Sequence, residues 1–341
     1  MVYYSKLNLS KEKDEISEEI LRNALKNKRR IDVVSAFYNS SDIFLKTIIS
    51  YANDKKNILY ITNEDERYID IMYYINKLSN LGQYVYSTKS NKVEDGYLYI
   101  STHENALKLQ KKFDLVIYND IRSFPKYNKE QIKEILLQMC TGEGTAIAYS
   151  VENVLNEGDP IMFPLKDTNI PIIEPRIITT RINLSMDIPL VVYEYLNWSI
   201  ISNRKVIIFT PDAEKATAVF EYLSNFKEKL NENIYLFIKG KSDDYIKLKF
   251  MEKERGIIVT NDFDGNYMQI PLVDVIVYFA DNSKFDYKQL FWLSSKVGRY
   301  ESTHRGEAIF LANVQTVQMD EAKDIARKFN EKAWERGLLS I

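Results

Sequence analysis

Short apolar strands alternate with amphipathic helices along nearly the whole chain, and this rhythm constrains the fold more than any other feature. Strands connected through helices lie parallel, and apolar strands of this kind are buried on both faces. The first half therefore predicts a parallel sheet covered by helices. The expected strands are Ile31–Ala36, Asn57–Thr62, Tyr97–Thr102, Phe113–Tyr118 and Thr145–Ser150, and the expected helices are Ser41–Tyr51, Tyr68–Leu78, Asn105–Lys111 and Lys129–Cys140.

The rhythm resumes after an irregular, proline-containing stretch from Glu152 to about Asp187. Such a stretch is typical of a connection between two units. We expect an N-terminal domain over 1–165, a linker over 166–185 and a C-terminal domain over 186–341. In the second half we expect strands at Lys205–Thr210, Asn233–Ile238, Gly256–Thr260, Val273–Phe279 and Ala308–Leu311, and helices at Leu190–Trp198, Pro211–Leu223, Asp243–Lys253 and Gln318–Arg336.

Length and composition fit this organisation. The 341 residues, 45% hydrophobic and 28% charged, suffice for two α/β domains. No apolar run approaches the roughly 20 residues that span a bilayer, and the N-terminus lacks a signal-peptide core, so we expect a cytoplasmic protein without membrane insertion. A single cysteine, Cys140, excludes disulfides and zinc-ribbon spacing. With a net charge of −2, any DNA binding depends on local basic patches.

The segment Lys284–Leu311 has the outline of the last motif of RecA-like helicase motors. In such motors a glutamine of this motif contacts the nucleotide, and an arginine stabilises charge on the γ-phosphate during transfer. Trp292 stands here in place of the glutamine and Lys296 in place of the first arginine, whereas Gly298 and Arg299 are kept. The motif thus keeps its framework and loses half of its chemistry.

Four further segments follow one another in the order of a known family. They are Ser101–Leu107 (STHENAL), Phe113–Ile117 (FDLVI), Phe124–Pro125, and Phe329–Ala333 (FNEKA) with Gly337–Leu339 behind it. The chain resembles the competence ComFA proteins, which are helicase-like ATPases of the ComF operon in Gram-positive bacteria. The resemblance implies the superfamily-two helicase fold, two tandem RecA-like parallel-sheet domains. The family's amino-terminal zinc module is missing, because no cysteine precedes Cys140.

The segment after the first strand departs from a phosphate-binding loop. Such a loop needs glycines that let N–H groups approach phosphate, a lysine, and a Ser or Thr for magnesium. Phe37–Asp42 (FYNSSD) contains neither glycine nor lysine. Ser40, Ser41 and Asp42 mark the place of a degenerate phosphate loop, in which Ser41 could hold magnesium. The alternative is an ordinary polar helix cap. We also expect the rings of Phe37 and Tyr38 to pack into the space that phosphates would need, or beneath Trp292 and Tyr267 of the second domain.

The other catalytic positions depart as well. Asn119 and Asp120 replace the Asp-Glu pair that holds magnesium and activates water, and neutral Asn119 cannot supply the charge. Leu9–Lys13 lacks the glutamine of the adenine-reading motif. We therefore expect no metal site, no cofactor and no multiple-turnover NTPase activity. The catalytic remnants are Ser40, Ser41, Asn119, Asp120, Lys296 and Arg299.

Three positions remain candidates for contact with DNA. Thr102 and Thr260 keep hydroxyls where helicases track phosphates, and His103 follows Thr102 as in the family. The alternative for both threonines is a strand-end hydroxyl that satisfies a loop amide, and for His103 a hydrogen-bonded loop residue. The acidic run Glu64–Glu66 nearby would repel phosphate.

Three hypotheses about function remain. The favoured one is a degenerate ComFA-like protein without ATPase chemistry, acting as an interaction or DNA-associated module in competence-type DNA uptake, with single-stranded DNA and competence-machinery proteins as partners. The second is an active single-stranded-DNA-dependent ATPase or translocase using ATP and magnesium, as the resemblance implies. The third is a binder of single-stranded DNA that works without nucleotide.

Overall fold

The computed structural model describes residues 2–26, 28–78, 84–87, 98–164, 170–226, 233–265, 270, 272–297 and 306–339. The chain divides into two compact units. Unit 1 comprises Met1–Asn169 and Lys332–Ile341, and unit 2 comprises Ile170–Glu331. In the part of the chain that is described, no helix is long and apolar enough to span a bilayer.

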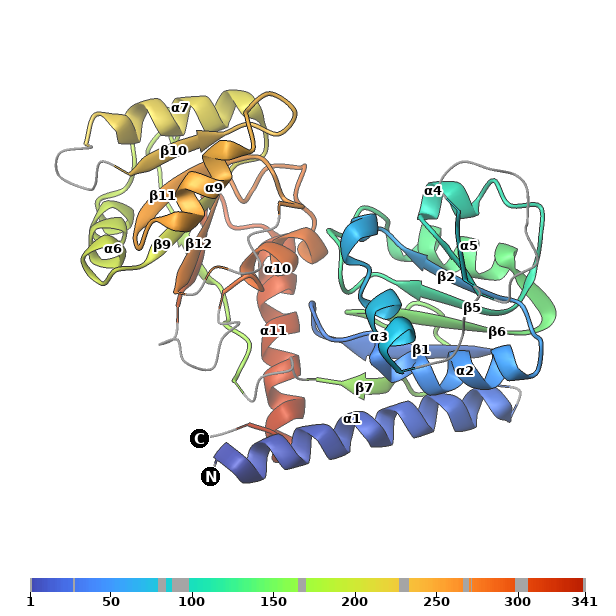
Figure 1. The fold of residues 1–341 in the computed structure, drawn as a ribbon. Helices are drawn as coiled ribbons and strands as arrows, with labels where there is room; N and C mark the ends of the chain where they lie inside the picture. Colours follow the sequence, from blue (N-terminus) through green and yellow to red (C-terminus); the bar gives the residue numbers. More distant parts are fainter. Residues whose placement is uncertain are drawn as a thin grey trace. The chain divides into compact units, whose positions relative to one another are not determined.

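Unit 1 contains a seven-stranded sheet in the order β3-β4-β2-β5-β6-β1-β7, in which the paired strands run parallel (Figure 1). Its central strands are buried along their length because apolar side chains line both faces. The prediction of a parallel sheet is confirmed. The strands are β1 (Arg30–Ser35), β2 (Ile58–Thr62), β3 (Tyr84–Ser87), β4 (Leu98–Ser101), β5 (Phe113–Asn119), β6 (Cys140–Ser150) and β7 (Ile161–Phe163).

The connecting elements of unit 1 are η1 (Asp42–Phe44), α2 (Leu45–Asn53), η2 (Glu66–Tyr68), α3 (Asp70–Leu78), α4 (His103–Ala106) and α5 (Lys129–Met139). One of our predictions is wrong. The helix expected over Asn105–Lys111 is the shorter α4, because the Thr102 hydroxyl caps its start and, in the polar stretch behind it, Leu109 is only partly buried. Without a continuous apolar face the helix does not extend.

A long helix that we did not predict, α1 (Val2–Leu25), precedes the sheet. Ile16, Ile20 and Ala24 recur every four residues and are 4%, 0% and 1% exposed, so they form the buried stripe of the helix. It packs against α2 and β7, which lie beside it in Figure 1, and against η1. The predicted adenine-reading segment, Leu9–Lys13, therefore lies within a continuous helix.

Unit 2 contains a six-stranded sheet, again with parallel pairing, in the order β10-β11-β9-β12-β13-β8. Its strands are β8 (Arg176–Thr179), β9 (Lys205–Phe209), β10 (Ile234–Phe237), β11 (Gly256–Thr260), β12 (Val273–Tyr278) and β13 (Ala308–Ala312). Its helices are α6 (Leu190–Ile201), α7 (Ala213–Ser224), α9 (Tyr245–Glu252), α10 (Tyr287–Ser294) and α11 (Val317–Glu335), and the end of α11 from Lys332 onward belongs to unit 1. The second predicted α/β unit is confirmed.

The proline-containing stretch is not wholly irregular, which corrects our expectation. β7 pairs with β1, and β8, which lies within the predicted linker 166–185, pairs with β13. Each is a short strand at the edge of its sheet, and β8 has no fully buried residue. Edge strands of three or four residues leave little apolar signal in a sequence.

Candidate functional site

The loops after β1, β2 and β5 meet at the carboxyl edge of the unit 1 sheet, where open parallel sheets bind their ligands. The structure brings several of the predicted remnants together there. Ser40, Ser41 and Asp42 follow β1, and Asn119 ends β5. The Asn119 amide donates to the Ser41 hydroxyl at 3.2 Å. The loop after β1 and the end of β5 thus form one polar cluster.

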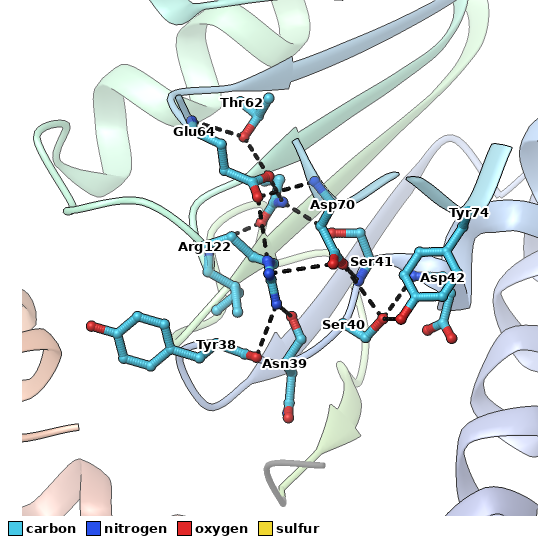
Figure 2. Close-up of polar contacts among 12 residues, drawn as sticks. Tyr38, Asn39, Ser40, Ser41, Asp42, Thr62, Glu64, Asp70, Tyr74 and Arg122 are labelled. Carbon is cyan, nitrogen blue, oxygen red and sulfur yellow. Dashed lines mark hydrogen bonds and ion pairs between the residues drawn. The ribbon is translucent and has the colours of Figure 1, made fainter. Parts of the chain in front are cut away.

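Arg122, which is not among the residues predicted from the sequence, forms the centre of this cluster (Figure 2). Its Nε lies 3.3 Å from Glu64 Oε2, and its Nη2 lies 3.3 Å from Asp70 Oδ1. Its Nη1 donates to the carbonyl oxygens of Tyr38 and Asn39 at 3.2 and 3.4 Å. The Arg122 side chain is 17% exposed, so these contacts are made largely away from water.

The first part of the loop after β1 thus has the opposite polarity to a phosphate-binding loop, whereas the Ser41 N–H still faces an anion, the Asp70 carboxylate. A phosphate needs a nest of N–H groups, whereas Tyr38 and Asn39 direct carbonyl oxygens at the Arg122 guanidinium. The N–H of Ser41 donates to Asp70 Oδ2 at 2.7 Å. A protein cation and a protein carboxylate therefore take the hydrogen bonds that this loop offers.

Tyr38 has a left-handed backbone with φ of 71°. For a residue with a side chain this conformation costs about 1–2 kcal/mol. Its N–H donates to the Ile121 carbonyl at 3.0 Å, and its own carbonyl accepts from Arg122. Contacts to the loop after β5 thus hold Tyr38 in this conformation. The rings of Phe37 and Tyr38 are buried, at 0% and 5% exposure; that they take the space of phosphates stays a prediction.

The hydroxyl of Ser40 accepts from the N–H of Asp42 at 3.3 Å, whereas Ser41, the N-cap residue of η1, makes no side-chain capping hydrogen bond. The Ser40 hydroxyl also lies 3.0 Å from the Tyr74 hydroxyl. Asp42 in turn forms a 2.9 Å salt bridge with Lys13 of α1. Lys13 is the position where the adenine-reading motif has its glutamine, so this position too is used by an internal ion pair.

Asn119 and Asp120 are also held by the protein itself. The Asn119 amide donates to Tyr60 Oη at 2.8 Å, and its oxygen accepts from the Ile121 N–H at 3.0 Å. Asp120 is 1% exposed, and its Oδ2 lies 3.5 Å from Ser150 Oγ. Within the described ranges, no group of three or more His, Cys, Asp or Glu side chains could hold a metal ion.

One cation, Arg122, lies between the two carboxylates of the cluster, those of Glu64 and Asp70. Burial raises the pKa of Glu64 above its ordinary value of 4.5, and the charge of Arg122 opposes this rise. Burial tends to lower the pKa of Arg122, but the carboxylates of Asp70 and Glu64 raise it overall. Arg122 is therefore a permanent cation placed between two acids.

The candidate DNA-binding residues of unit 1 lie at the carboxyl end of β4. Thr102 Oγ1 accepts from the Asn105 N–H at 3.3 Å and caps α4. His103 is 5% exposed; its Nδ1 shares a hydrogen bond with Tyr118 Oη at 3.1 Å, and its ring stacks on Tyr127 at 3.6 Å between centroids. Burial lowers the pKa of His103. The ring is thus a buried, neutral partner of two tyrosines.

The candidates of unit 2 are similarly enclosed. Thr260 is 0% exposed, and its hydroxyl accepts from the Asp262 N–H at 2.9 Å. Lys296 is 2% exposed and lies over the Trp292 ring at 5.3 Å. Arg299, with Gly298 and Tyr267, lies outside the described residues.

The two parallel sheets define the class of fold, the tandem RecA-like core of helicases. Among solved structures, S. cerevisiae Dbp5 bound to RNA and ADP BeF3 is similar with a TM-score of 0.54 and 13% identity, over 91% of this chain and 87% of that one. The DUF1998 helicase MrfA bound to DNA follows, with 0.53 and 12%, over 93% of this chain and 51% of that one.

RecG bound to a three-way DNA junction gives a TM-score of 0.52 and 12% identity, over 94% of this chain and 46% of that one. The chain therefore spans about half the length of MrfA and RecG. Likeness at this level of identity establishes the fold. No protein-family model matches the sequence. No curated protein matches it either.

Proposed function

We propose that this chain is a helicase-like protein that no longer hydrolyses ATP and uses its two units as an interaction or DNA-associated module. The observation that carries the proposal is the position of Arg122, whose guanidinium is bound by Asp70, Glu64 and two carbonyls of the loop after β1. These side chains and carbonyl oxygens thus fill the carboxyl edge of the unit 1 sheet, which is where we place the nucleotide site of an active helicase.

The free-energy cost of opening the Arg122 cluster is large enough to weaken ATP binding strongly. A triphosphate at the loop would meet two carboxylates and two carbonyl oxygens unless the Arg122 cluster came apart. Separating a buried ion pair costs on the order of 3–5 kcal/mol. This corresponds to about 10²- to 10⁴-fold in Kd. A nucleotide that a helicase binds with a Kd of about 1 μM would then bind with a Kd of about 0.1 to 10 mM.

Contact with nucleic acid is the second part of the proposal. Dbp5 was solved with RNA, and MrfA and RecG with DNA, all on the same fold. We assign the corresponding contact here to single-stranded DNA, through the loops that carry Thr102, His103 and Thr260. The resemblance to ComFA supports a place in competence-type DNA uptake with competence proteins as partners. Binding of a single strand does not require hydrolysis.

One titration distinguishes DNA binding without ATP hydrolysis from a DNA-stimulated ATPase. Labelled single-stranded oligonucleotide is titrated with the protein at several salt concentrations, with and without Mg·ATP, and phosphate release is followed in parallel. We expect salt-dependent binding that ATP does not change, and turnover no faster than background. DNA-stimulated turnover above about 1 s⁻¹ would instead support the active ATPase. Absence of DNA binding would leave the protein-interaction form alone.

A further inference from the structure

The amino edge of the unit 1 sheet, opposite the edge that holds the Arg122 cluster, carries basic residues that the proposed function does not use. The strands β2, β5, β6 and β1 lie side by side in this order and run parallel, so their amino ends meet at one edge (Figure 1). The basic residues before or at the start of β1, β2 and β5, here called the basic edge, are Lys26, Lys28, Arg29, Arg30, Lys55, Lys56, Lys111 and Lys112.

Hydrogen bonds fix the lysines before β2 beside those before β5. The Asn57 N–H donates to Asp114 Oδ2 at 2.8 Å, and the Asn57 carbonyl accepts from the Asp114 N–H at 2.9 Å. Asn57 follows Lys56 directly, and Asp114 lies two residues after Lys112. Two pairs of lysines that are distant in the sequence therefore lie next to each other at this edge.

The basic edge continues across β6 to the start of β1. The Ala146 N–H of β6 donates to the Arg29 carbonyl at 2.8 Å. Burial raises the pKa of Cys140, the first residue of β6, to about 11, whereas the positive charges of Arg30 and Lys112 oppose this rise. A cation from β1 and a cation from the segment before β5 thus act on the same thiol, so they belong to one surface.

The charge of the basic edge is positive although the whole chain has a net charge of −2. The acidic residues described at the same edge are Asp54, Asp114, Glu143, Glu157 and Asp159. Eight basic residues therefore face five acidic ones. Lys26, Lys55 and Lys112 are exposed, and in the described part of the chain none of them forms a salt bridge. Their ammonium groups face solvent and are available to an anionic partner.

We propose that the basic edge binds the phosphate backbone of double-stranded DNA. Neighbouring strands of a sheet lie about 4.8 Å apart, so the four strands from β2 to β1 spread these cations over roughly 15 Å. A DNA strand presents one phosphate about every 3.4 Å, so about four phosphates of one strand fit this length. Contacts to phosphate carry no sequence information, so this binding should not depend on sequence.

The aromatic rings at the basic edge favour a duplex over a single strand. Proteins that bind single strands stack the bases on aromatic side chains. The rings of Tyr51 and Tyr99 at this edge are buried. Lys56 lies over the first ring at 4.8 Å from its centroid, and Lys111 over the second at 4.7 Å. These rings position lysines and do not face bases. A duplex stacks its own bases and needs only its phosphates to be contacted.

The test is the fluorescence anisotropy of a labelled DNA duplex titrated with the full chain. The Kd should be below about 100 μM at low salt, the range of non-specific DNA binding, and should rise about 100-fold between about 50 and 200 mM KCl if about four phosphates are contacted. The proposal extends the DNA association proposed above to a second face. No nucleotide or single strand enters this titration, so its outcome is independent of single-strand binding through Thr102 and Thr260.

Matched variants make the test specific. Lys55→Gln combined with Lys112→Gln removes two exposed cations of the basic edge, and should weaken duplex binding at least tenfold and lower the salt slope by about two. Lys241→Gln combined with Lys328→Gln removes the same charge from exposed positions of unit 2 and should leave the Kd within about twofold. Circular dichroism of each variant shows whether it is folded.

A third variant should strengthen binding, which misfolding cannot do. Glu143 forms a 2.6 Å salt bridge with Arg29 at the start of β6. Glu143→Gln removes an acid from the basic edge and releases Arg29, so duplex binding should tighten about two- to fivefold.

Four results would overturn the proposal. They are a wild-type Kd above about 100 μM at about 50 mM KCl, a Kd that does not change with salt, equal weakening by the two double variants, and weaker binding by Glu143→Gln. Sedimentation with phosphatidylserine-containing vesicles, in the absence of duplex binding, would assign the basic edge to a lipid surface instead and would also contradict the proposal.

Discussion

Arg122 Nη2 lies 3.3 Å from Asp70 Oδ1, and the other oxygen of that carboxylate accepts the Ser41 N–H at 2.7 Å. A carboxylate thus receives an amide hydrogen bond at the position where a nucleotide-binding sheet offers its loop amides to phosphate. The guanidinium beside it balances the charge. At the carboxyl edge of the unit 1 sheet, the Asp70 carboxylate thus takes the place of a bound anion and the Arg122 guanidinium that of its counter-cation.

The first prediction concerns the stability of this cluster. Arg122→Met leaves Glu64 and Asp70 without their shared cation in a buried setting, so unfolding of the variant should require about 3–5 kcal/mol less than wild type. Urea denaturation measures the difference. Arg67→Met is the matched control, because the Arg67–Asp65 pair is largely exposed and should contribute at most about 1 kcal/mol. Equal losses in the two variants would show that burial of the Arg122 cluster has no energetic consequence.

The second prediction concerns pH. Burial lowers the pKa of His103 below its ordinary 6.5, so the native state binds a proton less readily than the unfolded state. The stabilisation by neutral His103 is complete above pH 6.5 and is lost as the pH falls through the pKa of the folded protein. The difference in unfolding free energy between wild type and His103→Phe should therefore shrink between pH 7.5 and pH 5. A difference that is constant or grows towards acid would contradict a buried neutral imidazole.

The third prediction separates capping from DNA contact at Thr102. Thr102→Ala removes the hydroxyl that caps α4 and should cost about 1 kcal/mol of stability, whereas Thr102→Ser should keep it. If the same hydroxyl contacts a phosphate of single-stranded DNA, Thr102→Ala should also weaken oligonucleotide binding and Thr102→Ser should not. Loss of stability with unchanged DNA affinity would leave Thr102 with the capping role alone.

The sheets could be predicted because their strands are continuous apolar runs, and such runs have one good solution, burial between helices. The helix expected from Pro211 begins at Ala213 as α7, because Asp212 caps it by accepting from the Lys215 N–H at 2.9 Å. Helix α1 was missed because its buried stripe is limited to positions such as Ile16 and Ile20 in a charged segment. We interpreted part of that segment as a nucleotide motif instead.

Arg122 could not be predicted from the sequence for a different reason. Its partners Glu64 and Asp70 are distant in the chain, and a charged residue in a loop is usually solvated. The sequence places Glu64 in an acidic run that would repel phosphate, yet the residue is 9% exposed and paired with Arg122. Arg122 joins the loops after β1, β2 and β5, and which loops lie side by side depends on the order of the strands in the sheet. The alternation of strands and helices in the sequence does not specify that order.

Binding of Mg·ATP to the wild-type chain, measured by isothermal titration calorimetry, tests the central claim most directly. If the Arg122 cluster fills the carboxyl edge of the unit 1 sheet, the Kd for ATP should be about 0.1 mM or weaker, with or without single-stranded DNA. Saturable binding with a Kd below about 100 μM would contradict the claim, because the loop would then accept phosphate despite the guanidinium and the carboxylates that occupy its hydrogen bonds.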